Sequence, residues 1–408
     1  MKKRYLTIGF LGLLGLVKLI QHISPKQPDP IIISDSTQFS EAVFLTTDNL
    51  GNPIITWSSA PTDSSQYQLA FSRMDKETLS VSEEKKVEKT TGMQVHHESM
   101  AKIGVKDNGD MLAIYRRVNP NSKRRFAGDI YYLESTDDGV TWSQEKKLVT
   151  DTTSSSQGFY DIARLANGEL GVTWLDSRKI EQKDGSSFFF NQTKAEGGFA
   201  KEKGLLGSTC QCCRTELQVD MYGKINIALR DIINDSIRDM VYISSIDNGK
   251  SFSKAKRISE DNWVINGCPH TGPTIATNST KRAVSWFTLG GSQGVYFTVG
   301  QQELNTSPKR ILINEEATHP QMVWSGDYFA LAYDLKVYHN GKPSRQVVVS
   351  FLDNDGNIKE TIKVSPVGEN STMPVIQQIN NEKLLVAWVN HKNDQQSAIK
   401  ARVIDGSI

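Results

Sequence analysis

Apolar and polar positions alternate along this chain in short runs, and helical periodicity is nearly absent. Seven stretches share one shape, a turn followed by an alternating or apolar strand. They read LGNPIITW, NGDMLAIY, NGELGVTW, YGKINIAL, TKRAVSWF, SGDYFALA and NEKLLVAW. They recur about every 55 residues, and further strand-like runs flank each one, so that each repeat holds about four short strands. This pattern predicts the four-stranded blades of a β-propeller.

The two ends of the chain complement each other in this pattern. The seventh repeat ends in AIKARVIDGSI and lacks a fourth strand, whereas DPIIISD at residues 29–35 precedes the first repeat and has no partner there. An N-terminal strand near residues 30–35 that completes the last blade would remove an exposed sheet edge. We therefore predict an all-β, seven-bladed β-propeller closed by this strand, with six blades as the fallback count. Residues 29–408 then form a single domain, which we expect to be a monomer.

The first 28 residues differ from this body. Lys2, Lys3 and Arg4 precede an apolar run from Tyr5 to Val17, and the polar stretch SPKQPDP follows. This pattern predicts a signal peptide, or an N-terminal membrane anchor with a linker because no small-residue cleavage site follows. We expect an extracytoplasmic protein, periplasmic, secreted or anchored, that contacts a membrane only through this segment. Disulfide bonds are chemically permitted in such a compartment.

The charge of the chain restricts its partners. The formal net charge is +1, which gives no reason to expect a nucleic acid or an anionic membrane surface as a partner. Hydrophobic residues make up 38% of the chain and charged residues 23%, as in an ordinary globular body. The ligands that remain are a small molecule, a glycan or a metal ion.

Two of the turns carry a sharper motif. STDDGVTW and SIDNGKSF both read S-x-D-x-G-x-[ST]-[WF], with residues Ser135, Asp137, Gly139, Trp142 and Ser245, Asp247, Gly249, Phe252. The Asp accepts hydrogen bonds from turn amides, the Gly takes a positive φ, and the aromatic ring packs between blade edges. The motif resembles the Asp box, or BNR repeat, of the sialidase superfamily, and the resemblance covers residues 29–408 at the level of the fold. These turns are structural and lie far from the channel.

The resemblance implies a sialidase-like glycoside hydrolase as one function. Sialidases use three arginines for the substrate carboxylate, a Tyr–Glu pair as nucleophile and an Asp as acid/base. This chain has no Arg-Ile-Pro motif, and its seven repeats differ from the usual six blades. Candidate catalytic residues, at or near predicted strand ends, are Tyr160, Asp161, Arg214 and Arg230. An Arg at a strand end is also typical of a structural ion pair, and Arg230-Asp231 and Arg238-Asp239 are the first pairs to expect.

Residues at the starts of the innermost strands converge on the channel mouth of a propeller. The seven starts read Ser40-Glu41, His96-His97-Glu98, Tyr160-Asp161, Cys212-Cys213-Arg214, Cys268-Pro269-His270, Thr318-His319 and Thr372-Met373. Four of the seven histidines and all four cysteines lie at or beside this ring. Cys, His and Met are ligands of soft or borderline metals, so the ring predicts a copper or zinc site. Its candidate ligands are His97, His270, His319, Cys213 and Met373.

The four cysteines admit other interpretations. Cys210, Cys212, Cys213 and Cys268 can form two disulfides, for which a bridge from the triplet to Cys268 is natural and a Cys212–Cys213 bridge is the most strained. The spacing Cys210-x-x-Cys213 is also that of a dithiol redox pair. The sequence is therefore compatible with three alternative functions. The first is a propeller that binds a ligand or metal at its channel mouth, the second a sialidase-type glycoside hydrolase, and the third a metal-dependent or redox enzyme.

Four tryptophans recur in phase with the repeats. Trp57, Trp174, Trp286 and Trp388 all end the second strand of their repeat. This periodicity is typical of residues that pack blade against blade, and a sugar-binding platform is the alternative.

Overall fold

The structure is a computed structural model that describes residues 28–62, 66–122, 126–267, 269–301, 309–393 and 396–408. The predicted leader, apart from residue 28, and Cys268 lie outside these residues. In the described part the chain is built from strands, with one short 3-10 turn, η1 (Glu88–Thr90). No helix within the described ranges is long and apolar enough to cross a membrane. The predicted all-β class is confirmed.

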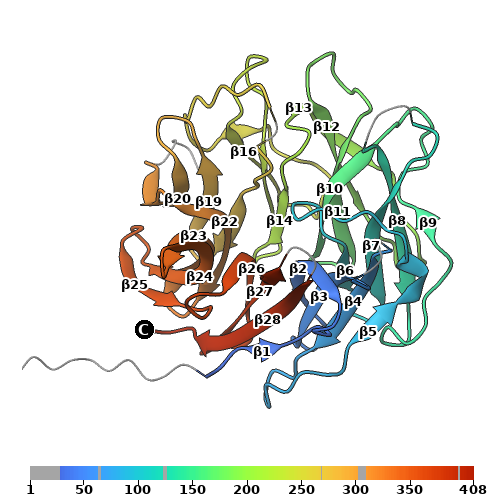
Figure 1. Ribbon diagram of the computed structural model, residues 1–408. Helices are drawn as coiled ribbons and strands as arrows, with labels where there is room; N and C mark the ends of the chain where they lie inside the picture. Colours follow the sequence, from blue (N-terminus) through green and yellow to red (C-terminus); the bar gives the residue numbers. More distant parts are fainter. Residues whose placement is uncertain (1–27, 63–65, 123–125, 268, 302–308, 394–395) are drawn as a thin grey trace, which may run out of the picture.

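Five sheets of the described chain contain four strands each (Figure 1). The first comprises β6 (Lys102–Val105), β7 (Met111–Val118), β8 (Gly128–Ser135) and β9 (Lys146–Lys147). The second comprises β10 (Gln157–Arg164), β11 (Leu170–Asp176), β12 (Ser186–Gln192) and β13 (Lys203–Thr209). The third comprises β14 (Glu216–Val219), β15 (Ile225–Arg230), β16 (Met240–Ser245) and β17 (Lys256–Arg257). The fourth comprises β18 (Thr274–Thr277), β19 (Lys281–Thr288), β20 (Gly294–Gln301) and β21 (Ile311–Asn314). The fifth comprises β22 (Ala317–Ser325), β23 (Tyr328–His339), β24 (Lys342–Leu352) and β25 (Ile358–Lys363).

The remaining strands form one eight-stranded sheet that contains both ends of the described chain. Its members are β26 (Asn370–Gln378), β27 (Lys383–Asn393), β28 (Gln396–Asp405), β2 (Phe39–Thr47), β3 (Pro53–Ala60), β4 (Gln68–Arg73), β5 (Lys85–Val87) and β1 (Ile31–Ile32). A single parallel pair, Phe39 and Ser397, joins β2 to β28. Farther along the same edge of β28, β1 pairs antiparallel with it, with Ile31 opposite Ala401, while β27 pairs along the opposite edge. The segment just before the first repeat therefore lies beside the last strand.

The sheets surround a central cavity. A cavity of about 1190 Å³ is lined mainly by β2, β6, β10, β14, β18, β22 and β26, which are the first strands of the seven repeats. Figure 1 shows the sheets placed around this centre. Four-stranded antiparallel sheets whose first strands face one channel define a propeller-like fold.

The core lies between neighbouring sheets. Trp57, Trp174, Trp286 and Trp388 are all fully buried, and Trp57 packs in one cluster with residues of β2, β26, β27 and β28. Because these rings are buried in the core, they are packing residues as the repeat phase predicts, and they offer no sugar-binding platform.

The two Asp boxes repeat the same hydrogen bonds. The Ser135 hydroxyl donates to Asp137 over 2.8 Å and accepts from the Gly139 N–H, and the Thr141 N–H donates to Asp137 over 2.8 Å. The second box has the same bonds around Asp247. The aromatic residues pack on the cores of adjacent sheets, with the ring of Phe252 5.0 Å from that of Phe190. The predicted local role of the motif is therefore confirmed.

Candidate functional site

The first strands of several sheets carry the same irregularity near their start. In β2, β10, β22 and β26 two residues face one residue of the next strand, which is the geometry of a β-bulge. The first bulged residue has a positive φ in each case; these residues are Ala42, Phe159, His319 and Met373. Non-glycine residues are held in this conformation only by their surroundings, and such positions concentrate at functional sites. We call this end of the central cavity the mouth.

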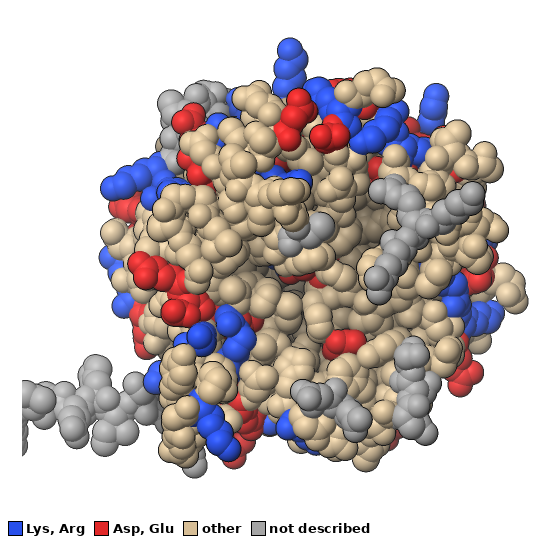
Figure 2. Space-filling view, turned by 45° about the horizontal axis from the view of Figure 1, so that its top comes forward, with Lys and Arg blue, Asp and Glu red and all other residues tan. Residues whose placement is uncertain are grey.

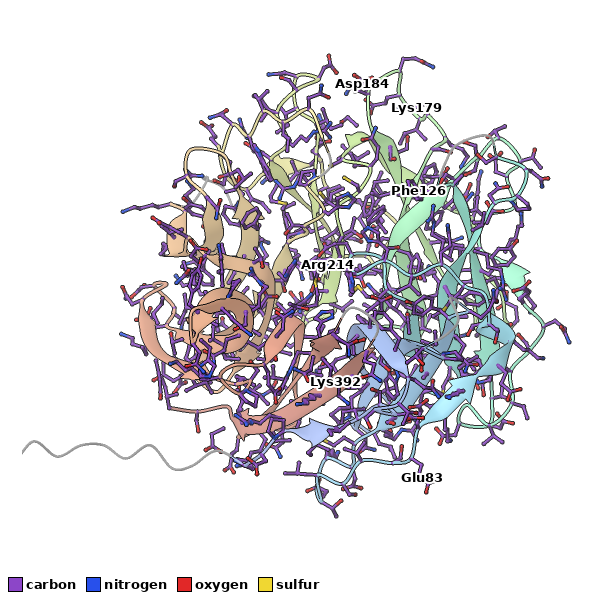
Figure 3. The ribbon with its side chains drawn as sticks, in the orientation of Figure 1. Glu83, Phe126, Lys179, Asp184, Arg214 and Lys392 are labelled. Atoms are coloured by element: carbon purple, nitrogen blue, oxygen red, sulfur yellow. The ribbon has the colours of Figure 1, made fainter. Side chains whose placement is uncertain are left out.

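Arg214 closes the cavity at the mouth. It precedes β14, is 5% exposed, and lies near the middle of the ring of sheets (Figure 3). Its guanidinium donates to the carbonyl oxygens of Pro273 and Pro320 over 3.1 and 3.2 Å, so it connects three sheets. It lines both the central cavity and a small pocket of about 10 Å³ at the mouth, which has room for about one water molecule. Nε of Arg214 and Oε2 of Glu98 are buried without a hydrogen-bond partner and lie 3.9 Å apart, so a single water would bridge them.

Three charged residues lie at matching positions of neighbouring first strands, just inside this closure. Lys102 donates to Asp161 over 2.6 Å, and Asp161 also accepts from the backbone N–H of Leu217 over 2.7 Å. Glu216 lies next along the ring. Burial and the negative charge of Asp161 raise the pKa of Glu216 to about 7. The wall of the cavity therefore holds a buried ion pair beside a carboxyl group that keeps its proton to neutral pH.

The small pocket at the mouth brings together three of the predicted metal ligands, His97, His319 and Met373. His97 pairs with Glu41 through Nε2 over 3.1 Å, and its Nδ1 is buried without a partner. His319 donates through Nδ1 to the fully buried Asp334 over 2.7 Å. Although these residues share a pocket, no three His, Cys, Asp or Glu ligand atoms within the described ranges converge there. The pocket is therefore a polar, hydrogen-bonded part of the mouth.

Figure 2 shows this face of the molecule hollowed near its middle, with acidic side chains visible inside the hollow. Few basic side chains are visible inside the hollow.

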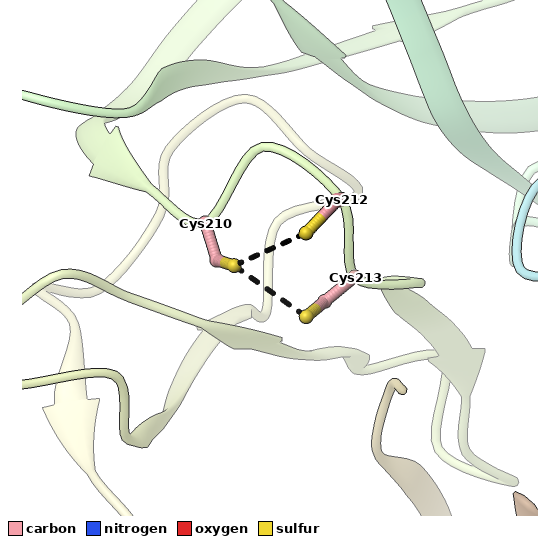
Figure 4. Close-up of side chains that lie close together, drawn as sticks. All are labelled: Cys210, Cys212 and Cys213. Atoms are coloured by element: carbon pink, nitrogen blue, oxygen red, sulfur yellow. Dashed lines mark hydrogen bonds between the residues drawn. The ribbon is translucent and has the colours of Figure 1, made fainter. Parts of the chain in front are cut away.

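A group of three thiols lies in the connection from β13 to β14. Sγ of Cys210 lies 3.8 Å from that of Cys212 and 3.5 Å from that of Cys213 (Figure 4). All three ligand atoms lie within 4.8 Å of one another, and the residues are 1%, 5% and 2% exposed. We call these residues the thiol cluster. Among the described residues, these three cysteines are the group of at least three possible metal ligands whose ligand atoms lie close together. Cys213 belongs to the predicted ligand set.

The backbone fixes the position of this cluster. The Cys210 N–H donates to the carbonyl oxygen of Arg230 over 2.9 Å, and Thr209 forms a β-bridge with Asp231. The end of β13 is thereby tied to the end of β15, so the thiols lie between two sheets. Hydrogen bonds from the thiols of Cys212 and Cys213, with the positive charge of Arg238, lower the pKa of Cys210, while burial raises the pKa of Cys213.

Two arginines border the thiol cluster. Nη1 of Arg238 lies 3.5 Å from Sγ of Cys210, and Nε of Arg238 donates to the carbonyl oxygen of Ile265. Arg230 is 1% exposed, lies over the ring of Trp263 and acts electrostatically on the Cys213 thiol. The expectation that these arginines pair with their sequence neighbours Asp231 and Asp239 is wrong. Asp239 pairs with Arg257, because β16 and β17 place that guanidinium beside it, and Asp231 accepts from Ser208.

His270 lies apart from the mouth pocket, beside His96. Their ring centroids are 5.2 Å apart, and burial together with His270 lowers the pKa of His96 to about 4. Phe159 packs against both His96 and the thiol cluster. The predicted single ring of ligands is thus divided among three places, namely the thiol cluster, this histidine pair and the mouth pocket.

The candidate catalytic residues are held in structural positions. The hydroxyl of Tyr160 is buried without a partner, and burial raises its pKa, so it is not an activated nucleophile. Arg230 donates to the carbonyl oxygens of Arg238 and Phe287, and Arg214 closes the cavity. Asp161 faces the central cavity but is paired with Lys102.

A Tyr–Glu pair does exist at another position. Tyr67, just before β4, donates a hydrogen bond to Glu41, and Glu41 also pairs with His97. Burial and this carboxylate raise the pKa of Tyr67. No sequence pattern pointed to this pair, because Tyr67 lies in the connection between the second and third strands, whose course depends on the tertiary structure.

Cys268 lies outside the described residues, so the predicted disulfide pairing remains a prediction. Among the described cysteines no two are joined by a disulfide bond.

The four-stranded sheets around one cavity, together with the two Asp boxes, define an Asp-box protein of propeller-like fold. Residues 54–299 match the BNR repeat-like domain, and the chain belongs to this family. The predicted relationship to the Asp-box, or BNR-repeat, proteins is confirmed.

Three solved structures illustrate the likeness. The polysaccharide lyase Uly1 is 12% identical with a TM-score of 0.56, and the match covers 95% of this chain and 94% of that one. A Dyadobacter fermentans protein of unknown function is 11% identical with a TM-score of 0.53, covering 94% and 99%. The NanB sialidase of Streptococcus pneumoniae is 12% identical with a TM-score of 0.50, covering 94% and 70%. No curated protein matches this chain. Identities this low establish the fold alone.

Proposed function

We propose that this protein is a metal-binding propeller whose thiol cluster takes one soft metal ion, copper or zinc, beside the channel mouth. The observation that carries the proposal is the convergence of three buried sulfur atoms within 4.8 Å of one another. Thiolates are the protein ligands that soft metals prefer, and close spacing reduces the conformational cost of binding.

The number and position of the sulfurs favour a metal over a structural disulfide. A bridge between any two of the three leaves the third thiol buried beside it. The backbone on both sides of the cluster is already held by the Cys210 hydrogen bond and the Thr209–Asp231 bridge, so a local disulfide would close only a very short loop. Short loops contribute little through the chain-entropy effect of a cross-link.

The test is metal analysis of protein purified without added reductant, together with a count of free thiols under denaturing conditions. We expect one equivalent of bound metal, lost in Cys210→Ser, Cys212→Ser and Cys213→Ser. His97→Ala and His270→Ala are comparison variants that should retain the metal, since neither residue belongs to the cluster. Metal lost in the histidine variants and retained in the cysteine variants would overturn the assignment. Bridged cysteines with no metal would reduce the cluster to disulfide staples or to a redox pair.

A sialidase-like glycoside hydrolase is the second candidate, and the Tyr67–Glu41 pair is the observation that favours it. A carboxylate hydrogen-bonded to a tyrosine places a base beside a nucleophile, although in the free protein burial and this carboxylate hold the proton on Tyr67. Turnover of a fluorogenic sialoside by the wild-type protein, abolished in Tyr67→Phe, would establish this function. Activity that persists in Tyr67→Phe would remove this pair from the mechanism.

We also propose that the fold is a ring of seven blades, in which β1 supplies the fourth strand of the last blade. The seven first strands that line the cavity and the pairing of β1 with β28 support this count. Residues 1–28 would direct the domain out of the cytoplasm or anchor it there. Export would be tested by locating the protein in fractionated cells, with a variant that lacks residues 2–20 as the control.

A further inference from the structure

Two arginines beside the thiol cluster lack any acidic partner. Neither Arg230 nor Arg238 forms an ion pair with a carboxylate within the described residues. The donors of Arg230 go to two carbonyl oxygens, and its Nε is buried without a partner. A buried guanidinium with no counter-charge is costly, so the fold requires negative charge near this place.

The thiol cluster can supply that charge. Nη1 of Arg238 lies 3.5 Å from Sγ of Cys210. Arg230 adjoins the cluster, because its carbonyl oxygen accepts from the Cys210 N–H over 2.9 Å and its guanidinium donates to the carbonyl oxygen of Arg238. Thiols become negative when they bind a metal, because the ligand is the thiolate. The two guanidinium groups therefore fit a metal–thiolate complex that carries a net negative charge.

The balance of charge depends on the metal. Three thiolates with a monovalent cation carry a net charge of about −2, which two guanidinium groups offset in full. With a divalent cation the complex carries about −1, and one guanidinium charge stays uncompensated in a buried place. Three sulfurs also leave zinc short of the four ligands of its structural sites.

We infer that the thiol cluster selects a monovalent soft cation, copper(I), and that Arg230 and Arg238 set this selectivity by balancing the charge of the complex. This inference rests on the proposed function and names its ligand. Binding replaces three S–H bonds by three copper–sulfur bonds, and the three protons pass to the solvent. No electron is transferred in this step, because copper enters in the reduced state.

The experiment compares two metals on the reduced protein under anaerobic conditions. Copper(I) is measured by competition with bicinchoninate, and zinc(II) by competition with a chromophoric chelator. Arg238→Met removes one positive charge, and Arg238→Lys is the matched control that retains it. In Arg238→Met we expect copper(I) affinity to fall by about tenfold or more and zinc(II) affinity to fall by clearly less, because the copper(I) complex carries the larger negative charge. Arg238→Lys should retain the wild-type preference.

The outcomes separate this inference from the function on which it rests. If Arg238→Met weakens both metals equally, or neither, the charge-balance inference is overturned while the metal site stands. Absence of both metals from the reduced wild-type protein would overturn the metal site itself. Cys268→Ser tests the number of ligands: unchanged copper(I) affinity supports three sulfurs, and a large loss would show a fourth sulfur and overturn the three-sulfur balance.

Discussion

Nδ1 of His319 lies 2.7 Å from Oδ2 of Asp334, a carboxylate that is fully buried and also accepts from Thr318 and from the backbone N–H of Met373. Arg345 pairs with the same carboxylate. Burial opposes the ionisation of Asp334, but His319 and Arg345 outweigh it and lower its pKa. One carboxylate thus fixes two bulged residues of the mouth, His319 and Met373, from behind.

Asp334→Asn should therefore destabilise the fold by about 3–5 kcal/mol at pH 7, because it leaves His319 and Arg345 without their buried counter-charge. A carboxylate with a lowered pKa stabilises the fold above its ordinary pKa, and this contribution is lost as the pH falls through the folded-state value. The difference from wild type, measured by urea denaturation, should shrink toward pH 3. Asp327→Asn, at an exposed position, is the control. An equal effect of both variants would contradict this role.

Glu216→Gln should stabilise the fold at high pH, whereas Asp334→Asn should destabilise it. The pKa of this carboxyl is raised to about 7, so the folded state binds its proton more tightly than the unfolded chain. Stability from this group is present below its ordinary pKa of 4.5 and is lost as the pH rises to about 7. We expect Glu216→Gln to be more stable than wild type at pH 8, by up to about 3 kcal/mol, and nearly equal at pH 4. Thermal unfolding at the two pH values measures this, with exposed Glu382→Gln as the comparison. A wild-type protein that becomes more stable relative to Glu216→Gln between pH 5 and pH 8 would contradict this prediction.

Asp137→Ala should lower the Tm by a few degrees. The carboxylate orders its turn through bonds with Ser135 and Thr141, and side-chain and backbone hydrogen bonds from Thr141 lower its pKa to about 2. This stabilisation holds above the ordinary pKa of Asp and is lost as the pH falls toward 2. The exposed Asp184 provides a control, and Asp184→Ala should leave the Tm unchanged. Because the second Asp box has the same bonds, Asp247→Ala should lower the Tm by a similar amount. An unchanged Tm in Asp247→Ala would show that the stabilisation is confined to the first box.

Gly249→Ala and Gly197→Ala separate packing from backbone conformation. Both glycines have a positive φ, 76° and 92°, so alanine costs about 1–2 kcal/mol at either position through the backbone alone. A Cβ atom on Gly249 would lie 2.5 Å from the ring of Phe190, whereas one on Gly197 would meet nothing within 4 Å. We expect Gly249→Ala to cost at least about 1 kcal/mol more in urea denaturation. Equal costs would show that the Phe190 ring moves aside freely.

The repeats and Asp boxes could be predicted because their causes are local. The alternation of strands, the glycine at a positive φ and the serine–aspartate hydrogen bonds all depend on residues within one turn of chain. The sequence also places Cys213, His319 and Met373 correctly at the starts of first strands.

The division of the predicted ring could not be read from the sequence. The bulge of β22 places His319 at the mouth pocket, whereas His270, which precedes β18, lies beside His96. The contact of Arg238 with Cys210 could not be predicted for a similar reason. Arg238 precedes β16, and only the crossing of the β15–β16 connection with the end of β13 brings it to Cys210.

The pairing of β1 with β28 has a mechanical consequence. A pull on the chain before residue 28 would reach the fold at Ile31 and Ile32, which are exposed and hold only two paired positions on β28. The load would first peel this short strand away, while the sheets that carry the mouth and the thiol cluster stay intact. Under a pull at this end, the pairing of β1 with β28 would therefore separate before any force reaches the cysteines.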